Sequence, residues 1–259
     1  MSRIEVPKDH PRKVSLDIRE RIIEGHELDI VATAGLLAHG RGEAFDYMIG
    51  ETTNQQAMEA CRAAVAALLI AKHPVISVNG NACSLVPEEL VRLSEITGAN
   101  LEINLFYYRP EREEAILKAL QDAGATDVLG THGRPSETIP ELSSNRRRVD
   151  SEGIAKADVV LVPLEDGDRT EALKAVGKFV LTIDLNPMSR TAVFSDVSIV
   201  DNIVRAMPLM VDYAAEMKDW SHEKLRELVD RFDNKANLAA ELSLMIAHLE
   251  NQRMKEEQP

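Results

Sequence analysis

The chain has 259 residues, of which 44% are hydrophobic and 28% charged, and its formal net charge is −13. This length suits one large α/β domain or two small ones, and the acidic balance argues against a general nucleic-acid binder, which needs a basic face. The low aromatic content of 4% also disfavours a stacking platform for single strands.

The sequence predicts a cytoplasmic protein without a membrane segment. Its first fifteen residues, MSRIEVPKDHPRKVS, lack the apolar core of a secretory signal. The longest apolar run, residues 63–71, is far shorter than the ~20 residues that cross a bilayer. Cys61 and Cys83 form no metal-binding pattern, and we expect both thiols to be reduced and buried.

The first part of the chain is expected to be helical. Ser15 is a candidate cap for a first helix, and Gly25 is a plausible end of it. A second, short helix over 31–38 is expected to be broken by Gly40 and Gly42, since glycine lowers helix stability.

An alternation of strands and helices follows. Thr53 begins a capping-box pattern before an alanine-rich helix that ends ahead of Pro74. The apolar runs expected as strands cover 75–78, 101–107, 127–129, 159–162, 179–183 and 197–200, and helical segments over 87–98, 111–123 and 169–176 lie between them. This alternation predicts an α/β, Rossmann-like fold, with a mostly parallel sheet covered by helices on both faces and helical N- and C-terminal extensions.

We expect a single domain over 1–259, with a helical part (1–72), a sheet core (73–205) and C-terminal helices (206–259). The polar, proline-containing stretch 131–151 is non-periodic, as functional or mobile loops are. A helical apolar stripe follows near the C-terminus, and it either packs on the domain's own core or makes a dimer contact; its members are Leu238, Leu242, Met245 and Leu249.

Several common site motifs are absent from the sequence. Gly177-Lys178 is followed by Phe179, which excludes a P-loop, and no strand leads into a GxGxxG fingerprint. There is no HExxH, GxSxG or cysteine–histidine cluster, so hydrolase and zinc functions are disfavoured and no metal-ligating residues are predicted.

Polar clusters instead follow three expected strands, at the sheet edge where open α/β folds bind ligands. The clusters cover 79–82, 130–134 and 184–191. Asp184 can accept from ribose hydroxyls, and Arg190 and Thr191 can bind phosphate oxygens. Each cluster also has a plain structural explanation as a turn, a surface loop or a strand end, and the arginine run 146–148 is either a solvated patch or a phosphate clamp.

The chain resembles the archaeal-type phosphopantothenate synthetases, also called 4-phosphopantoate–β-alanine ligases. The resemblance covers nearly the whole chain and is carried by PRKVSLDIRERIIEG, ATAGLLAHGRGEAFDYMIGE, ISVNGNA, LGTHGRPSETIPELSSNRR and TIDLNPMSRTA with VSIVDNIVRA. It implies a Rossmann-like homodimer in coenzyme A biosynthesis that condenses 4-phosphopantoate with β-alanine. The reaction uses ATP and Mg²⁺ and releases AMP and pyrophosphate through an acyl adenylate.

The resemblance also implies a set of ATP contacts, namely Arg19, Arg41, Asp184, Leu185, Asn186, Arg190, Thr191, Asn202 and Ile203. Strand-end placement, rather than the resemblance, suggests Asn79, Asn81 and Arg134 as phosphopantoate contacts. His132 is a candidate base for the β-alanine amine, and the adenylate phosphate is an equally good one. Mg²⁺ held by phosphates and water needs no dedicated metal motif.

Because a net charge of −13 repels both anionic substrates, we expect most of these arginines to cluster on one wall of a pocket. Two alternatives remain open from the residues. A Rossmann-type oxidoreductase would show a nicotinamide-dependent absorbance change, and a non-catalytic nucleotide-binding regulator would bind ATP without turnover.

Overall fold

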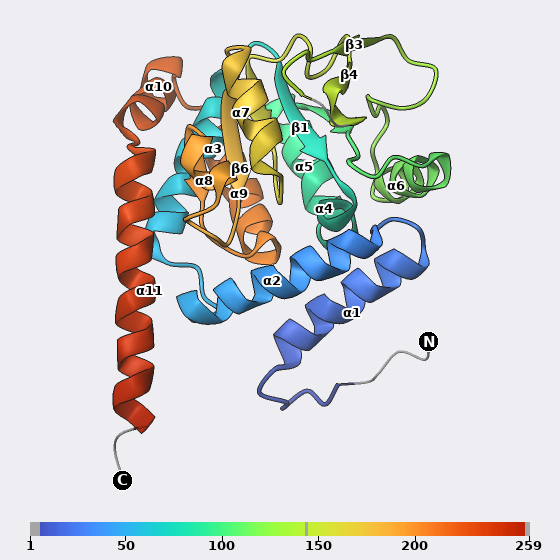
Figure 1. Cartoon of the computed structure of the whole chain (residues 1–259). Coiled ribbons are helices and arrows are strands. Elements are labelled where there is room, and N and C mark those ends of the chain that lie inside the picture. Colours follow the sequence, from blue (N-terminus) through green and yellow to red (C-terminus); the bar gives the residue numbers. More distant parts are fainter. Residues whose placement is uncertain (1–5, 143–144, 257–259) are drawn as a thin grey trace.

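Five short strands form one parallel sheet in the computed structural model, which describes residues 6–142 and 145–256 (Figure 1). They are β1 (Pro74–Val78), β2 (Asn100–Ile103), β5 (Val159–Leu161), β6 (Phe179–Ile183) and β7 (Val197–Ile199). Their order in the sheet is β2-β1-β5-β6-β7, and every neighbouring pair is parallel. The predicted α/β, Rossmann-like architecture is confirmed.

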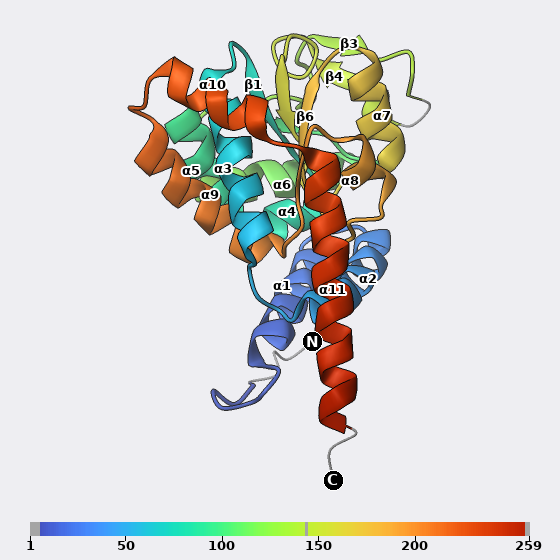
Figure 2. The same cartoon turned by 90° about the vertical axis from the view of Figure 1, so that its left-hand side faces the viewer.

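Helices cover both faces of this sheet (Figure 2). On one face lie α3 (Gln55–Ile70), α5 (Pro87–Thr97) and α9 (Ile203–Met217), and on the other lie α7 (Gly167–Ala175) and α8 (Arg190–Phe194). Parallel strands buried on both sides are apolar throughout, which is why β1 and β5 have no exposed residue. All carboxyl ends of the strands therefore point to one edge of the sheet.

The remaining elements surround this core. They are α1 (Lys13–Glu27), α2 (Thr33–Ile49), α4 (Gly80–Leu85), α6 (Pro110–Asp122), β3 (Ser136–Thr138), η1 (Asn145–Arg147), β4 (Arg148–Asp150), α10 (His222–Arg231) and α11 (Asn234–Glu256). The segment expected as an irregular loop thus contains an antiparallel pair, β3–β4, beside the main sheet. Cys61 and Cys83 are free and buried, and burial raises the pKa of both thiols.

The expected break in the second helix is wrong. Helix α2 continues through Gly40 and Gly42 and ends at Gly50, whose φ of 82° is the left-handed conformation common after a helix. Interior glycines cost about 1 kcal/mol each, and an added Cβ would meet nothing within 4 Å at Gly40 and only Leu185 at 3.6 Å at Gly42, so the close approach in α2 is at Gly35. A Cβ on Gly35 would stand 2.2 Å from Asn81 Oδ1, so only glycine lets the helix approach that side chain.

Three further local expectations need correction. Ser15 lies inside α1 and its hydroxyl donates to the Arg12 carbonyl, and the helix runs past Gly25 to Glu27. The cap of α3 is Asn54, since the Thr53 hydroxyl donates to Asp201 instead.

The expected strand over 127–129 is also wrong. Only Leu129 pairs with the sheet, through an isolated bridge to Glu102, because the chain reaches the edge of β2 there for a single residue.

The first half of helix α11 packs part of the C-terminal stripe on the chain's own core. Leu238 and Met245 are buried, whereas Leu249 is 49% exposed. Figure 2 shows that the C-terminal half of α11 extends beyond the other elements. Among the described helices, none is both long and apolar enough to span a bilayer.

Candidate functional site

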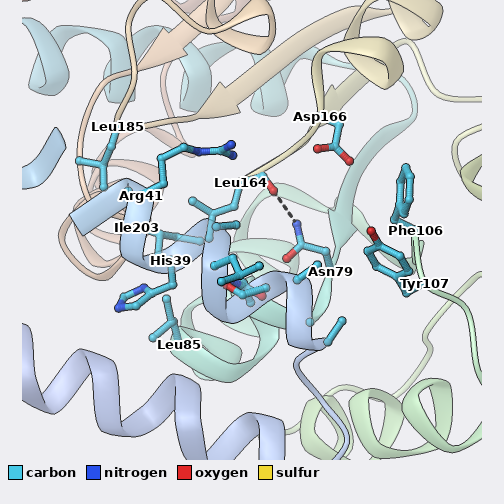
Figure 3. A pocket seen from close by; sticks show the side chains of 18 of the residues that line it. His39, Arg41, Asn79, Leu85, Phe106, Tyr107, Leu164, Asp166, Leu185 and Ile203 are labelled. Carbon is cyan, nitrogen blue, oxygen red and sulfur yellow. Dashed lines mark hydrogen bonds between the residues drawn. The ribbon is translucent and has the colours of Figure 1, made fainter. Parts of the chain in front are cut away.

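The carboxyl ends of all five parallel strands meet at one cavity of about 670 Å³ (Figure 3). Loops that follow β1, β2, β5, β6 and β7 line it from the sheet side, and α1 and α2 close it from the opposite side. Five of its lining residues are arginines, namely Arg41, Arg112, Arg146, Arg169 and Arg190. Four carboxylates, Glu43, Asp46, Asp166 and Asp168, line the same cavity, so its charged side chains carry an excess of one positive charge in a strongly acidic chain.

One end of the cavity combines apolar walls with a single cation. Arg41, Leu185 and Ile203 lie together there, from α2, the loop after β6 and the start of α9 (Figure 3). Asp184 lies just behind Leu185 and does not line the cavity itself. Burial raises the pKa of Asp184, and this effect is opposed by hydrogen bonds from Ser189 and the Asn186 backbone N–H and by the charge of Arg41.

A buried polar network supports this end from behind. Asn202 caps α9 through its Oδ1 and donates from Nδ2 to Asp46 over 2.7 Å. Arg205 pairs with both Asp46 and Asp201, and the Thr53 hydroxyl also donates to Asp201. The network ties α2, α3 and α9 together, which fixes the wall that carries Ile203.

The polar residues after β6 have two different roles: one lies on the cavity rim, and the others stabilise the loop. Arg190 lies on the cavity rim, exposed, where it pairs with Asp168 and Glu171. The buried Thr191 hydroxyl donates to the Glu165 carbonyl over 2.8 Å, and Asn186 accepts from the Met188 backbone N–H. Neither Thr191 nor Asn186 lines the cavity, so the chain uses their polar groups to shape this loop.

The two asparagines after β1 line the middle of the cavity. Asn79 caps α4 by accepting from the Ala82 N–H over 3.0 Å, and its Nδ2 donates to the carbonyls of Pro163 and Leu164 (Figure 3). Asn81 Nδ2 donates to the Gly35 carbonyl over 2.9 Å. Both amides therefore join β1 to neighbouring elements and leave only part of their hydrogen-bonding capacity for a ligand.

The other end of the cavity holds three buried arginines. Arg112 and Arg146 are each 6% exposed and Arg169 is 1% exposed. Sequence reasoning placed Arg112 and Arg169 on ordinary amphipathic helices, because a charged residue at helical spacing is normally solvated. Only the fold reveals that both side chains point inward.

Besides Asp184, Asn186 and Thr191, three further predicted site residues lie outside the cavity. Arg19 on α1 donates to Glu43 in a separate shallow cleft. His132 is exposed, with its backbone N–H bonded to Glu113, and Arg134 pairs with Asp150 in a second cavity of about 550 Å³ beside β2. Of the arginines Arg19, Arg41 and Arg190, the last two share the main cavity.

A different histidine, which the sequence analysis did not single out, lines the main cavity. His39 comes from α2, and its ring points away from Arg41, toward Leu85 (Figure 3). Its Nε2 is buried and has no hydrogen-bond partner within the described part of the chain. Burial lowers the pKa of His39, so the imidazole is neutral near pH 7. The signal in the sequence was its place in the HGRGE segment beside Arg41.

Comparison with known proteins shows which family this chain resembles. Residues 56–248 match the family described as phosphopantothenate/pantothenate synthetase. A protein of Thermococcus kodakarensis named 4-phosphopantoate–β-alanine ligase is 56% identical over 91% of this chain and 90% of its own length. The protein of the same name in Methanosarcina mazei is 50% identical over 95% of this chain and 96% of its own length.

Proposed function

This chain belongs to the phosphopantothenate/pantothenate synthetase family, and we propose that it condenses 4-phosphopantoate with β-alanine to form 4-phosphopantothenate in coenzyme A biosynthesis. The reaction uses ATP and proceeds through an acyl adenylate, with AMP and pyrophosphate as the other products. The observation that carries this proposal is the single cavity that gathers five arginines in a chain of net charge −13.

The cavity has room for a nucleotide and a small acid together, since its volume of about 670 Å³ lies in the range of ligand sites. We assign ATP to the end formed by Arg41, Leu185 and Ile203. The apolar side chains there suit a base, Arg41 offers its guanidinium group to phosphate oxygens at this end, and Arg190 offers a second one from the rim. Asp184, Asn186 and Thr191 act in this assignment by shaping the wall, and Asn202 lines the cavity itself.

The chemistry explains why two anions must meet in one cationic cavity. A carboxylate is a poor electrophile, so one of its oxygens attacks the α-phosphorus of ATP and pyrophosphate leaves. Negative charge grows on the phosphate oxygens during this step, and arginines fixed in a partly dry cavity stabilise it. The amine nitrogen of β-alanine then attacks the activated carbonyl carbon, and AMP leaves as the C–O bond breaks.

The attacking amine must first lose a proton. His132 is exposed and outside the cavity, so we assign this proton to a phosphate oxygen of the adenylate, which is adjacent to the attacking nitrogen. His39 lines the cavity but faces Leu85 on the other side of α2 from Arg41 (Figure 3), away from the ATP end.

The rim of the cavity also suits Mg²⁺. Asp166 and Asp168 present carboxylate oxygens there, and the Asp166 side chain is 60% exposed, so hard ligands of the kind that Mg²⁺ prefers are available. When bound with ATP, the ion would neutralise charge on the phosphates. These two carboxylates, which pair with Arg146 and Arg190 in this structure, would help to hold it beside the phosphates.

We further propose that the protein acts as a homodimer through the second half of α11. Leu244, Ile246, Leu249 and Met254 are all exposed large apolar residues on this projecting helix. A monomeric mass in solution at micromolar concentration would contradict this part of the proposal.

The decisive test measures AMP release from ATP while each substrate is omitted in turn. AMP should form only when 4-phosphopantoate and β-alanine are both present, and exchange of labelled pyrophosphate into ATP should need 4-phosphopantoate alone. Arg231→Ala serves as a matched control, because that side chain is 77% exposed and remote from the cavity. ATP binding without turnover would instead support a non-catalytic nucleotide-binding regulator. A nicotinamide-dependent absorbance change would support a Rossmann-type oxidoreductase.

A further inference from the structure

We propose that the second cavity, the one of about 550 Å³ beside β2, holds the carboxylate of β-alanine, so that the amine of this substrate faces the main cavity. Arg147 would anchor the carboxylate, and Asn104 would orient the ammonium group. This inference rests on the proposed function and deepens it, because the amine substrate has no assigned site there.

The two cavities are neighbours that share one wall residue. Leu105, in the loop directly after β2, lines both of them. Two adjacent residues of η1 also divide between the cavities, since Arg146 lines the main one and Arg147 lines the second one. Figure 3 shows Phe106, the next residue of the loop, at the end of the main cavity opposite Arg41. The second cavity therefore borders the part of the main cavity that the proposed nucleotide leaves free.

Charged side chains of both signs line the second cavity. They are Arg134, Arg147, Arg148, Glu113 and Asp150. Arg134 is already neutralised, because its Nε donates to the buried Asp150 over 2.6 Å and its Nη1 pairs with the exposed Asp127. This pair is therefore part of the fold, and it leaves the other three charges to meet a ligand.

Those three charges leave one cation over. Burial and the Glu113 carboxylate raise the pKa of Tyr108, and the charge of Arg148 opposes this rise, so Glu113 and Arg148 act on the same hydroxyl. Arg147 is exposed and has no ion pair with the described residues. The charged lining of the cavity thus carries an excess of one positive charge, and Arg147 is the side chain that can give it to a ligand.

The buried carboxylate of Glu102 keeps this excess from being larger. Glu102 accepts from the backbone N–H groups of Asp150 over 3.0 Å and Ile154 over 2.6 Å, directly behind the cavity. Burial raises the pKa of Glu102 to about 7, so the group carries part of a negative charge near neutral pH. An excess of at most one charge suits a monocarboxylate and disfavours a phosphate dianion.

Asn104 supplies a second recognition group. Asn104 is 4% exposed and lines the second cavity. Its Nδ2 donates to the carbonyls of Arg146 over 3.4 Å and Arg148 over 3.0 Å, which fixes the orientation of the amide. Its Oδ1 is buried and has no hydrogen-bond partner in the described ranges. Buried acceptors are almost always satisfied, and an ammonium N–H from the cavity would satisfy this one.

A cation and an open acceptor in one cavity match an amino acid, which has a carboxylate and an ammonium group. With the carboxylate of β-alanine on the Arg147 guanidinium, the nitrogen can point to Asn104 and the Leu105 wall. The ammonium then gives a proton to the adenylate phosphate, and the nitrogen attacks the acyl carbon as the C–O bond to AMP breaks. The carboxylate takes no part in this step and stays paired with Arg147.

The test measures the KM of all three substrates for wild type, Arg147→Gln and Arg147→Lys. Arg147→Gln should raise the KM for β-alanine by about tenfold to hundredfold, as loss of a hydrogen bond between charged groups does. The kcat and the KM for ATP and 4-phosphopantoate should stay within about threefold. Arg147→Lys keeps the charge but loses the planar fork, so its KM for β-alanine should fall between the other two.

Exchange of labelled pyrophosphate into ATP separates a binding role from a structural one. This half-reaction needs 4-phosphopantoate but no β-alanine, so Arg147→Gln should leave its rate within about threefold of wild type. Arg92→Gln is the matched control, because Arg92 is exposed on α5 and lines neither cavity. An unchanged KM for β-alanine in Arg147→Gln, or a parallel loss of the exchange reaction, would overturn the inference.

Calorimetric titration with β-alanine alone separates this inference from the proposed function. β-Alanine should bind wild type, and it should bind Arg147→Gln at least about tenfold more weakly. That result supports the amino-acid site even if wild type forms no AMP, which would refute the ligase alone. The same titration curve for both proteins, including no heat in either, would refute the site whatever the activity.

Discussion

Replacing Glu241 by glutamine should stabilise the protein above neutral pH and leave it nearly unchanged near pH 5. Glu241 on α11 is 0% exposed; its Oε2 accepts from Asn54 over 2.7 Å, and its Oε1 has no partner within the described ranges. Burial raises the pKa of Glu241 to about 7 from the ordinary 4.5, and the neighbouring charge of Asp201 adds to this rise. The folded state therefore favours the protonated carboxyl.

The sign and size of the effect follow from proton linkage. Between pH 4.5 and 7 the unfolded chain releases this proton while the folded chain retains it, so stability falls as pH rises through that window and is constant above it. The full shift would amount to about 3 kcal/mol at roughly 1.4 kcal/mol per pKa unit. Because a buried carboxylate is stabilised in part by relaxation of the protein around it, our expectation is about 1–3 kcal/mol.

Urea denaturation at pH 5 and pH 8 measures this difference directly. Glu241→Gln should match wild type within about 0.7 kcal/mol at pH 5 and exceed it by about 1–3 kcal/mol at pH 8. Glu250→Gln, an exposed change on the same helix, is the control and should show no pH-dependent difference. Glu102 also has a raised pKa, but it is present in every protein compared and its contribution cancels. A gain of equal size at both pH values would refute the reasoning, because it would reflect packing rather than the buried charge.

The other predictions concern catalysis. Arg41→Ala and Arg190→Ala should each raise the KM for ATP by about tenfold while the melting temperature changes little, since neither side chain is buried; unchanged ATP saturation would remove that residue from the nucleotide site. Asn81→Ala should raise the KM for 4-phosphopantoate more than that for ATP, and the opposite order would reverse our assignment of the two ends. His132→Ala should change kcat by less than about twofold, because a proton acceptor must be within hydrogen-bond reach of the amine; a much larger loss would make this imidazole the base after all.

The positions of most strands along the chain were predictable because these segments carry strong local signals. The run over 179–183 is apolar and β-branched, and β6 occupies the same residues. Asn79 and Asn81 after β1, Arg190 after β6 and Asn202 after β7 do line one cavity, as expected for parallel strands whose carboxyl ends share one edge. The local sequence pattern was therefore sufficient to predict the position of a residue in the fold wherever that position depends on one strand alone.

The failures share one physical cause, which is that long-range contacts overrode local preference. The weak run at 127–129 could not be recognised as a single bridge, and the residues after it, including His132 and Arg134, were consequently assigned to the wrong part of the sheet edge. Arg112 and Arg169 resemble solvated helix residues until the fold surrounds them with Tyr107, Glu165 and the cavity.

The strand order has a geometric consequence for how the two substrates meet. The loops after β1 and β6 are separated by one intervening strand, β5, and neighbouring strands are about 4.8 Å apart, so the two loop bases stand about 10 Å from each other. Backbone hydrogen bonds set that spacing, and side-chain replacements on the rim leave it unchanged. Exchange of rim residues can thus alter which acid or nucleotide is accepted while the span between their docking points stays constant.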